Sequence, residues 1–151
     1  MTDEEYMQAA LSLAEKAEKK NEVPIGCVIV KDGKIIAKAY NKKERKKNPL
    51  YHAEMAAINK AVKKTGDWRL NDCTLYVTLE PCPMCAGAIV NARIGRVVFG
   101  AYERKSGSAV SKFNILTDSG LNHETQFSGG ISEEKCVNIL QRYFAAKRKK
   151  K

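Results

Sequence analysis

The chain has 151 residues, 44% of them hydrophobic and 29% charged, a size and composition expected for one globular domain over residues 1–151. Its start is acidic, and no apolar run approaches the roughly 20 residues that cross a bilayer, so we expect a cytoplasmic protein without a signal peptide, a membrane span or a membrane partner. The 27 Lys and Arg against 17 Asp and Glu give a formal charge of +10, which favours a polyanionic partner such as nucleic acid.

Helical and strand periodicities alternate along the chain, without an internal repeat or a linker. The expected elements are, in order, a helix over residues 2–20, strands over 25–30 and 35–40, a helix over 52–64, a strand over 74–78, a helix over 83–92, a strand over 96–101, a short helix over 110–116, a weak strand over 124–127 and a helix over 132–148. Thr2 and Glu5 are spaced for a capping box at the first helix, and Asp32-Gly33 is typical of a hairpin turn.

This order of elements predicts an α/β fold in which one five-stranded mixed sheet is flanked by helices on both faces, giving three layers. The opening hairpin must be antiparallel. The last strands should pair in parallel, because each is expected to follow a helix.

Four residues at the starts of two predicted helices indicate a catalytic metal site. His52 and Glu54 begin one helix and Cys82 and Cys85 begin the next, in the pattern H-x-E…P-C-x-x-C. Catalytic zinc sites have three protein ligands and keep a fourth position open for water, whereas structural sites usually have four. We therefore expect His52, Cys82 and Cys85 to bind one zinc ion per subunit and Glu54 to transfer protons.

Other interpretations of these residues remain open. C-x-x-C at a helix start is also a thioredoxin-like redox pattern, and Cys73 could supply a fourth ligand to a purely structural zinc site. His52 and Glu54 could also serve only to cap a helix. The remaining cysteines, Cys27, Cys73 and Cys136, lie in apolar patterns and are expected to be buried and structural.

Two basic runs carry much of the positive charge, one at residues 42–47 shortly before His52 and one at residues 147–151. The first can be interpreted as a solvated loop and the second as a flexible, solubilising tail. A basic run so close to a predicted metal ligand favours contacts with the phosphates of a nucleic acid instead.

Several stretches resemble the family of bacterial tRNA-specific adenosine deaminases, in the cytidine deaminase-like superfamily. The similarity is collinear and covers essentially the whole chain. The matching stretches are residues 22–26, 52–54, 68–70, 75–88, 92–94, 97–101, 105–107, 121–123 and 143–144. The resemblance implies a three-layer α-β-α cytidine deaminase-like fold and zinc-dependent hydrolysis of adenosine to inosine at wobble position 34 of tRNA.

The resemblance also implies roles for individual residues. Glu54 would protonate the ring nitrogen and then the leaving amine. Four further residues would bind the tRNA anticodon stem-loop: Asn41, Ala53, Asn122 and His123. By composition alone, Asn41 would only end a hairpin strand. A homodimer is implied as well, with the helix after Cys85 contributing to its interface.

The sequence departs from the family pattern at residues 48–51, which read Asn-Pro-Leu-Tyr, and at Ala145-Ala146, where the family often has arginine after an aromatic pair. Both departures fall on the proposed RNA-binding surface, and neither touches the predicted metal ligands. These departures therefore affect the prediction of which tRNA nucleotides are recognised, but not the prediction of the metal site.

Two rival functions share parts of this pattern. A small-molecule deaminase acting on guanine, cytosine or a free nucleoside would have the same metal motif, but would give no reason for lysines beside the pocket. A catalytically silent zinc-binding RNA module would not need Glu54. The basic runs and Glu54 therefore favour a tRNA deaminase.

Overall fold

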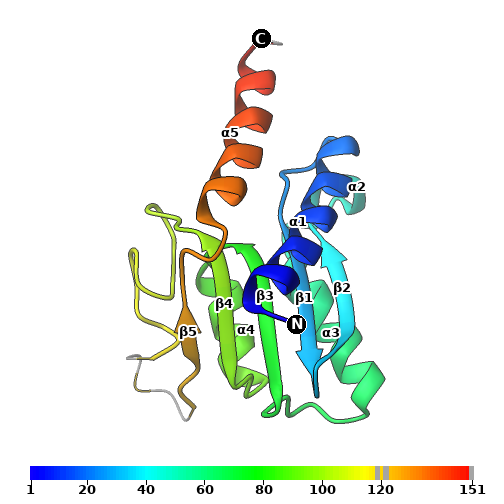
Figure 1. The fold of residues 1–151 in the computed structure, drawn as a ribbon, viewed down its shortest axis with the longest axis vertical. Coiled ribbons are helices and arrows are strands. Elements are labelled where there is room, and N and C mark those ends of the chain that lie inside the picture. Colours follow the sequence, from blue (N-terminus) through cyan, green and yellow to red (C-terminus); the bar gives the residue numbers. More distant parts are fainter. Residues whose placement is uncertain (118–119, 121–122, 150–151) are drawn as a thin grey trace.

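The computed structural model describes residues 1–117, 120 and 123–149. A central sheet separates two layers of helices (Figure 1). On one face lie α1 (Asp3–Lys19) and α5 (Glu133–Lys149), and on the other lie α3 (Ala53–Thr65) and α4 (Pro83–Asn91). The predicted three-layer α/β architecture is confirmed.

The sheet has five strands in the order β2-β1-β3-β4-β5. Their bounds are β1 (Gly26–Lys31), β2 (Lys34–Tyr40), β3 (Cys73–Leu79), β4 (Arg96–Ala101) and β5 (Gln126–Ser128). β1 pairs antiparallel with β2 and β3, whereas β4 pairs in parallel with β3 and β5, so the predicted mixed sheet is confirmed. In this topology the start of β1 and the ends of β2 and β3 lie at the same end of the sheet. The starts of α3 and α4 lie at that end as well.

Local signals account for the ends of several elements. The hydroxyl of Thr2 accepts a hydrogen bond from the N–H of Glu5, whose carboxylate accepts one from the N–H of Thr2, so the capping box is confirmed. Asp32 and Gly33 both have positive φ, 51° and 74°, as a two-residue turn between right-twisted strands requires.

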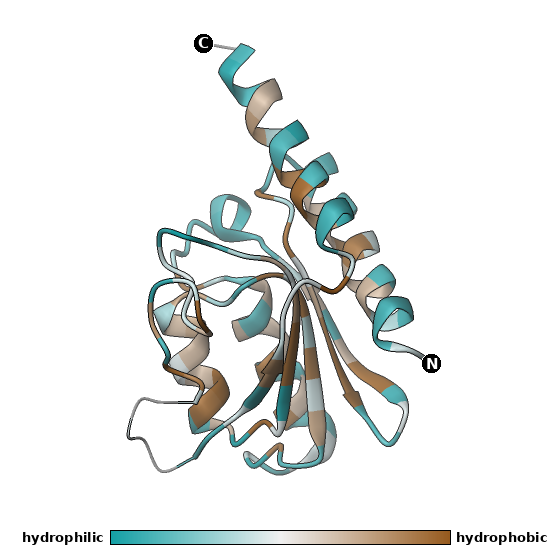
Figure 2. Cartoon of the chain, turned by 60° about the vertical axis from the view of Figure 1, so that its left-hand side comes forward, coloured by the Kyte–Doolittle hydropathy of each residue, from teal (hydrophilic) through white to brown (hydrophobic). Residues whose placement is uncertain are grey.

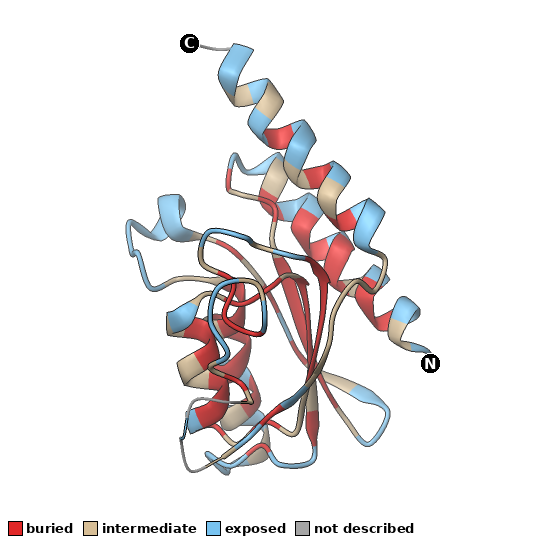
Figure 3. Cartoon of the chain, turned by 90° about the vertical axis from the view of Figure 1, so that its left-hand side faces the viewer, coloured by how far each residue is buried: buried red, intermediate tan, exposed pale blue. Residues whose placement is uncertain are grey.

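Each face of the sheet packs on its helices through a separate apolar cluster. Figure 2 shows hydrophobic residues concentrated along the strands, and Figure 3 shows the strands to be largely buried. Laterally paired residues of three strands alternate between the faces: Ile29, Leu75 and Val97 contact the α3 and α4 side, and Val28, Tyr76 and Val98 contact the α1 and α5 side. This period of two residues fixes the register of the central strands.

The connection from β4 to β5 differs from the prediction. Residues 110–116 form turns instead of a helix, and the expected strand 124–127 is β5, at Gln126–Ser128. The N–H groups of Lys112 and Phe113 both donate to the carbonyl of Gly107, whereas in a helix each would donate to the carbonyl four residues earlier. The buried carboxylate of Glu80 holds these turns in place by accepting the N–H groups of Glu103, Ala109, Val110 and Ser111. β4 and β5 are parallel, as predicted, although the described part of their connection contains no helix.

Both basic runs contain more helix than the sequence suggests. Residues Lys43–Lys46 form the one-turn helix α2, and α5 continues to Lys149, so that its outer half extends beyond the sheet (Figure 1). Residues 150–151 lie outside the described part of the chain. Among the described residues, no helix has the length and apolar character needed to span a membrane.

Candidate metal centre and adjoining pocket

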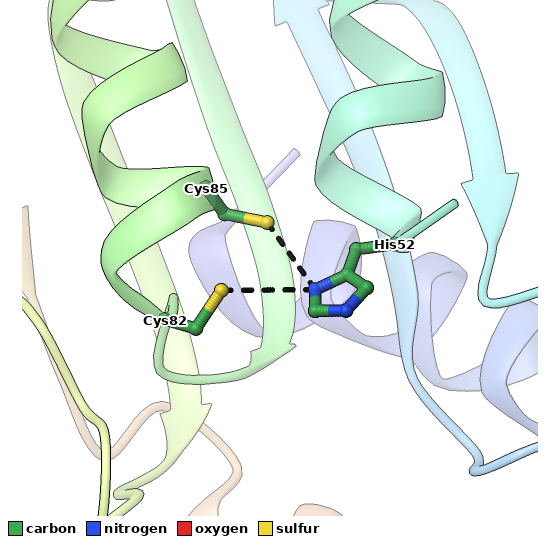
Figure 4. Close-up of side chains that lie close together, drawn as sticks. All are labelled: His52, Cys82 and Cys85. Atoms are coloured by element: carbon green, nitrogen blue, oxygen red, sulfur yellow. Dashed lines mark hydrogen bonds between the residues drawn. The ribbon is translucent and has the colours of Figure 1, made fainter. Parts of the chain in front are cut away.

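The starts of α3 and α4 present three side chains to one another (Figure 4). His52 is the N-cap residue of α3, Cys82 is the N-cap residue of α4, and Cys85 lies in the first turn of α4. Neither His52 nor Cys82 uses its side chain to cap its own helix, so capping does not explain the imidazole.

The spacing of the three donor atoms fits a zinc ion. Nδ1 of His52 lies 3.7 Å from Sγ of Cys82 and 3.6 Å from Sγ of Cys85, and all three donors lie within 4.8 Å of one another. Tetrahedral zinc with nitrogen at about 2.0–2.1 Å and sulfur at about 2.3 Å places these atoms about 3.6 Å apart. Among the described residues, Cys73 does not join this group, because it begins β3 whereas Cys82 follows the other end of that strand.

Hydrogen bonding distributes charge unevenly over the two thiols. The hydrogen bond from Cys85, aided by His52 and opposed by burial, lowers the pKa of Cys82 to about 4. The same hydrogen bond and burial raise the pKa of Cys85 far above its usual value. The hydrogen bond with Cys82 also raises the pKa of His52. Cys82 is thus a thiolate and Cys85 holds a proton, which metal binding must release.

Glu54 lies in the first turn of α3 and is 4% exposed. Burial raises the pKa of its carboxyl group to about 7. The carboxyl group interacts with the thiol of Cys85, but Glu54 is not one of the clustered donors. A carboxyl group that titrates near neutrality beside a metal site can both accept and donate a proton.

A pocket of about 350 Å³ opens beside this group, which is within the range of small-molecule sites. His52 and Ala53 line it at the start of α3, and Tyr143 and Lys147 line it from α5. Residues 21–23, Ile25, Asn41 and the start of α2 complete the lining. The pocket therefore joins the candidate metal site to both basic runs.

Asn41 lines this pocket, but its side chain is bonded to the protein itself. Its Nδ2 donates to the carbonyl of Val23 at 3.2 Å, and its Oδ1 accepts the N–H of Lys43 at 3.0 Å. A primary amide has two N–H donors and two acceptor positions, so one of each is left for a ligand.

Of the other two expected substrate contacts, only His123 is described, and it does not line the pocket. Asn122 lies outside the described residues. The ring of His123 hydrogen-bonds through Nε2 with the carbonyl of Ile94 at 2.9 Å, just before β4 and at the sheet edge opposite His52. Its contact with RNA stays a prediction.

Glu22 and Tyr143 also line the pocket, although the sequence assigned neither of them a role in the site. Both lie in stretches that carry the family resemblance, residues 22–26 and 143–144, and this was the only available signal. Their positions depend on contacts between distant parts of the chain, because the hydroxyl of Tyr143 donates to the carbonyl of Asn21 at 3.3 Å.

Lysines near the pocket lie against aromatic rings. Nζ of Lys42 is 4.9 Å from the ring centre of Tyr40 and 6.0 Å from that of Tyr51. Nζ of Lys147 is 5.5 Å from the ring centre of Tyr143. Such contacts restrict the positions of the cations and leave their charge available to a polyanion.

The chain is similar to known deaminases along nearly its whole length. The family model of MafB19-like deaminases matches residues 1–148. A tRNA-specific adenosine deaminase of Bacillus subtilis (strain 168) is 49% identical over 149 residues, which cover 99% of this chain and 92% of that relative.

Two solved structures extend the comparison. One comes from a study of A-to-I editing by tRNA:A34 deaminases at the wobble position of transfer RNA; it has a TM-score of 0.86 and 39% identity, over 90% of this chain and 99% of the other. A guanine deaminase from Bacillus subtilis has a TM-score of 0.66 and 34% identity, over 85% of each chain. The greater similarity is to the proteins that act on tRNA.

Proposed function

The chain belongs to the family of tRNA-specific adenosine deaminases, among the MafB19-like deaminases, and from this premise we propose that it converts adenosine to inosine at wobble position 34 of tRNA with a zinc ion. The expected cytidine deaminase-like fold and the expected activity, hydrolysis of a C–N bond, are both confirmed. The observation that carries the proposal is the group of His52, Cys82 and Cys85 with the buried Glu54 beside it.

The proposed roles divide the site between metal binding and proton transfer. His52, Cys82 and Cys85 would hold one zinc ion per subunit, and Glu54 would be the catalytic acid and base. When bound, zinc lowers the pKa of water and so supplies a nucleophile. The starts of α3 and α4 direct partial positive charge at the site, which stabilises thiolates and the negative charge that develops during attack.

Glu54 is placed to move the protons of the reaction. Its carboxylate would take a proton from the attacking water and deliver it to N1 of the adenine ring, while the water oxygen bonds to C6. A second transfer through Glu54 would carry the remaining proton of the oxygen on C6 to the amino group, so that the C6–N bond breaks, the C6 carbonyl forms and ammonia leaves. Adenosine and water thereby give inosine and ammonia. The raised pKa of Glu54, near neutrality, suits both directions of transfer.

The basic lining supports tRNA over a free base as the substrate. Lys43 and Lys147 line the pocket that begins at His52, and phosphates are the partners that such lysines favour. The 34% identical guanine deaminase makes a small-molecule deaminase the second candidate. A tRNA substrate also implies the cytoplasm as the site of action.

We also propose a homodimer with α4 at its interface. α4 contains no charged residue, and Met84, Gly87 and Ala88 on it are partly exposed. An uncharged face of this kind is suited to burial against a second copy. Light scattering during gel filtration would show a dimer if this is correct and a monomer if it is not.

The deaminase activity is tested by incubating the protein with total tRNA and sequencing for A-to-I changes, with ammonia release from guanine, cytosine and free adenosine measured in parallel. We expect changes confined to position 34 and no release from free bases. Ammonia release from guanine without any change in tRNA would establish the small-molecule activity instead.

A further inference from the structure

The buried carboxylate of Glu22 is bonded to the basic segment, which we define as residues 42–47. Glu22 follows α1, is 1% exposed and lines the pocket. Its Oε1 accepts the N–H of Glu44 at 2.9 Å, and its Oε2 accepts the N–H of Arg45 at 2.7 Å. Within the described part of the chain, its carboxylate forms no ion pair. Both oxygens of a buried anion are thus committed to the backbone of one short segment.

The basic segment depends on these bonds for its conformation. Its helix, α2, has four residues, and a helix of one turn is unstable in isolation. The N-cap residue, Lys42, makes no capping hydrogen bond with its side chain. The first three N–H groups of α2 are accepted from outside it instead, one by Asn41 and two by Glu22. Capping groups from elsewhere in the fold therefore determine where α2 forms.

The position of this segment decides which charges reach the pocket. Lys43 and Glu44 line the pocket, and the N–H of Lys42 donates to the carbonyl of Tyr51, directly before His52. The segment carries five cations and one acidic residue, so it is strongly attractive to phosphates. A carboxylate beneath it can stabilise this concentration of positive charge without occupying the exposed ammonium groups.

We propose that Glu22 is a positioning residue for the RNA substrate: its buried carboxylate fixes the backbone of the basic segment so that Lys43 and its neighbours stand at the mouth of the pocket. The inference rests on the proposed tRNA substrate. Glutamine at position 22 would have nearly the same volume, but one of its two terminal groups is an N–H donor and cannot accept from the backbone. Glu22→Gln therefore removes one of the two bonds and the negative charge, with little change in packing.

Glu22→Gln is compared with Glu4→Gln, which removes the same charge from an exposed position in the first turn of α1. For an anticodon stem-loop, we expect KM to rise on the order of tenfold in Glu22→Gln, because cations that are no longer held in place bind phosphates less well. We expect kcat at saturating RNA and the zinc content to stay close to wild type in both variants. Trypsin should cut Glu22→Gln faster than Glu4→Gln within residues 42–47, and bound RNA should slow this cleavage.

An unchanged KM in folded Glu22→Gln would overturn the inference. A loss of zinc with a proportional fall in kcat would also overturn it, because Glu22 would then position the metal ligand His52 and not the basic segment. If Glu22→Gln does not fold, hydrogen exchange of the wild type decides the question: the amides of Glu44 and Arg45 should be protected in the free protein, and residues 42–47 should gain protection with RNA. Rapid exchange of these two amides would overturn it. A wild type that binds no anticodon stem-loop would instead refute the proposed function itself.

Discussion

Nδ1 of His52 lies 3.6 Å from Sγ of Cys85, although these residues are 33 positions apart and belong to different helices. β3 accounts for this proximity. α3 leads into the start of β3, and α4 begins just after the opposite end of that strand. The two helix starts therefore lie side by side, and each donor stands on a rigid element. Such a site needs little rearrangement to bind a metal ion.

Purified protein should contain one zinc ion per chain, and Cys85→Ser should remove it. Because Cys85 must lose its raised-pKa proton to become a ligand, zinc affinity should fall as the pH is lowered, by up to about tenfold per pH unit for each proton released. Metal analysis with competition titrations from pH 6 to about 8 checks this. Cys73→Ser is the control, and loss of zinc in that variant would indicate a closed structural site.

Glu54→Gln should abolish most deamination without loss of zinc. Glutamine keeps the shape of the side chain but cannot accept the proton from water, and general acid–base groups contribute on the order of 10²–10⁴ in rate. Single-turnover rates on an anticodon stem-loop, with zinc content and RNA affinity measured on the same samples, check this. If the variant loses its zinc, Glu54 is a ligand and its assigned role is wrong.

Much of the fold and of the metal site could be predicted because the signals lie close together in the sequence. The capping box of Thr2 and Glu5 and the turn at Asp32-Gly33 each involve neighbouring residues. Cys82 and Cys85 are three positions apart at one helix start. The alternation of apolar residues in β1, β3 and β4 likewise indicates which faces are buried.

Features that depend on distant residues could not be predicted in this way. Glu80 accepts the N–H of Val110, thirty positions later, and so holds the turns that are found where residues 110–116 suggest a helix. Glu22 stabilises α2 through Arg45, and Tyr143 reaches the pocket only because α5 packs beside the end of α1. Periodicity within one segment contains no information about such partners. Hydrogen-bonded partners that are far apart in the sequence can be identified only from the three-dimensional structure.

Replacing Lys43 and Lys147 together with glutamine should weaken tRNA binding and reduce its dependence on salt. Both residues line the pocket, and each phosphate contact in a single strand contributes about −0.7 to the slope of log K against log salt. Loss of two contacts should therefore flatten the slope by about 1.4. Filter binding from 50 to about 300 mM salt measures this slope.

The matched control replaces Lys63 and Lys64, which are exposed in the last turn of α3, away from His52 at its start. These changes remove the same charge, so only a general electrostatic effect should remain. Equal losses of affinity in both double variants would show that the pocket lysines make no specific phosphate contacts.

Asp3→Asn should lower the free energy of unfolding at neutral pH but have less effect in acid. Asp3 accepts two hydrogen bonds from Arg96, at 2.8 and 3.1 Å, and one from the hydroxyl of Tyr76, at 2.7 Å. The bond with Arg96, aided by that with Tyr76 and opposed by burial, lowers the pKa of Asp3 below its usual value of 3.8. Because the Arg96 side chain is 38% exposed, the loss should be modest, about 1–2 kcal/mol.

The sign of the pH dependence follows from the lowered pKa. The folded protein binds its proton on Asp3 more weakly than the unfolded chain does, so this carboxylate stabilises the fold fully above about pH 4. That contribution is lost as the pH falls through the pKa of the folded state. Urea unfolding of wild type and Asp3→Asn should therefore differ at pH 7, and the difference should shrink as the pH is lowered below the usual pKa of 3.8. Asp72→Asn, an exposed change in a turn, should show no such convergence, and a constant difference for Asp3→Asn would mean that the ion pair is not its cause.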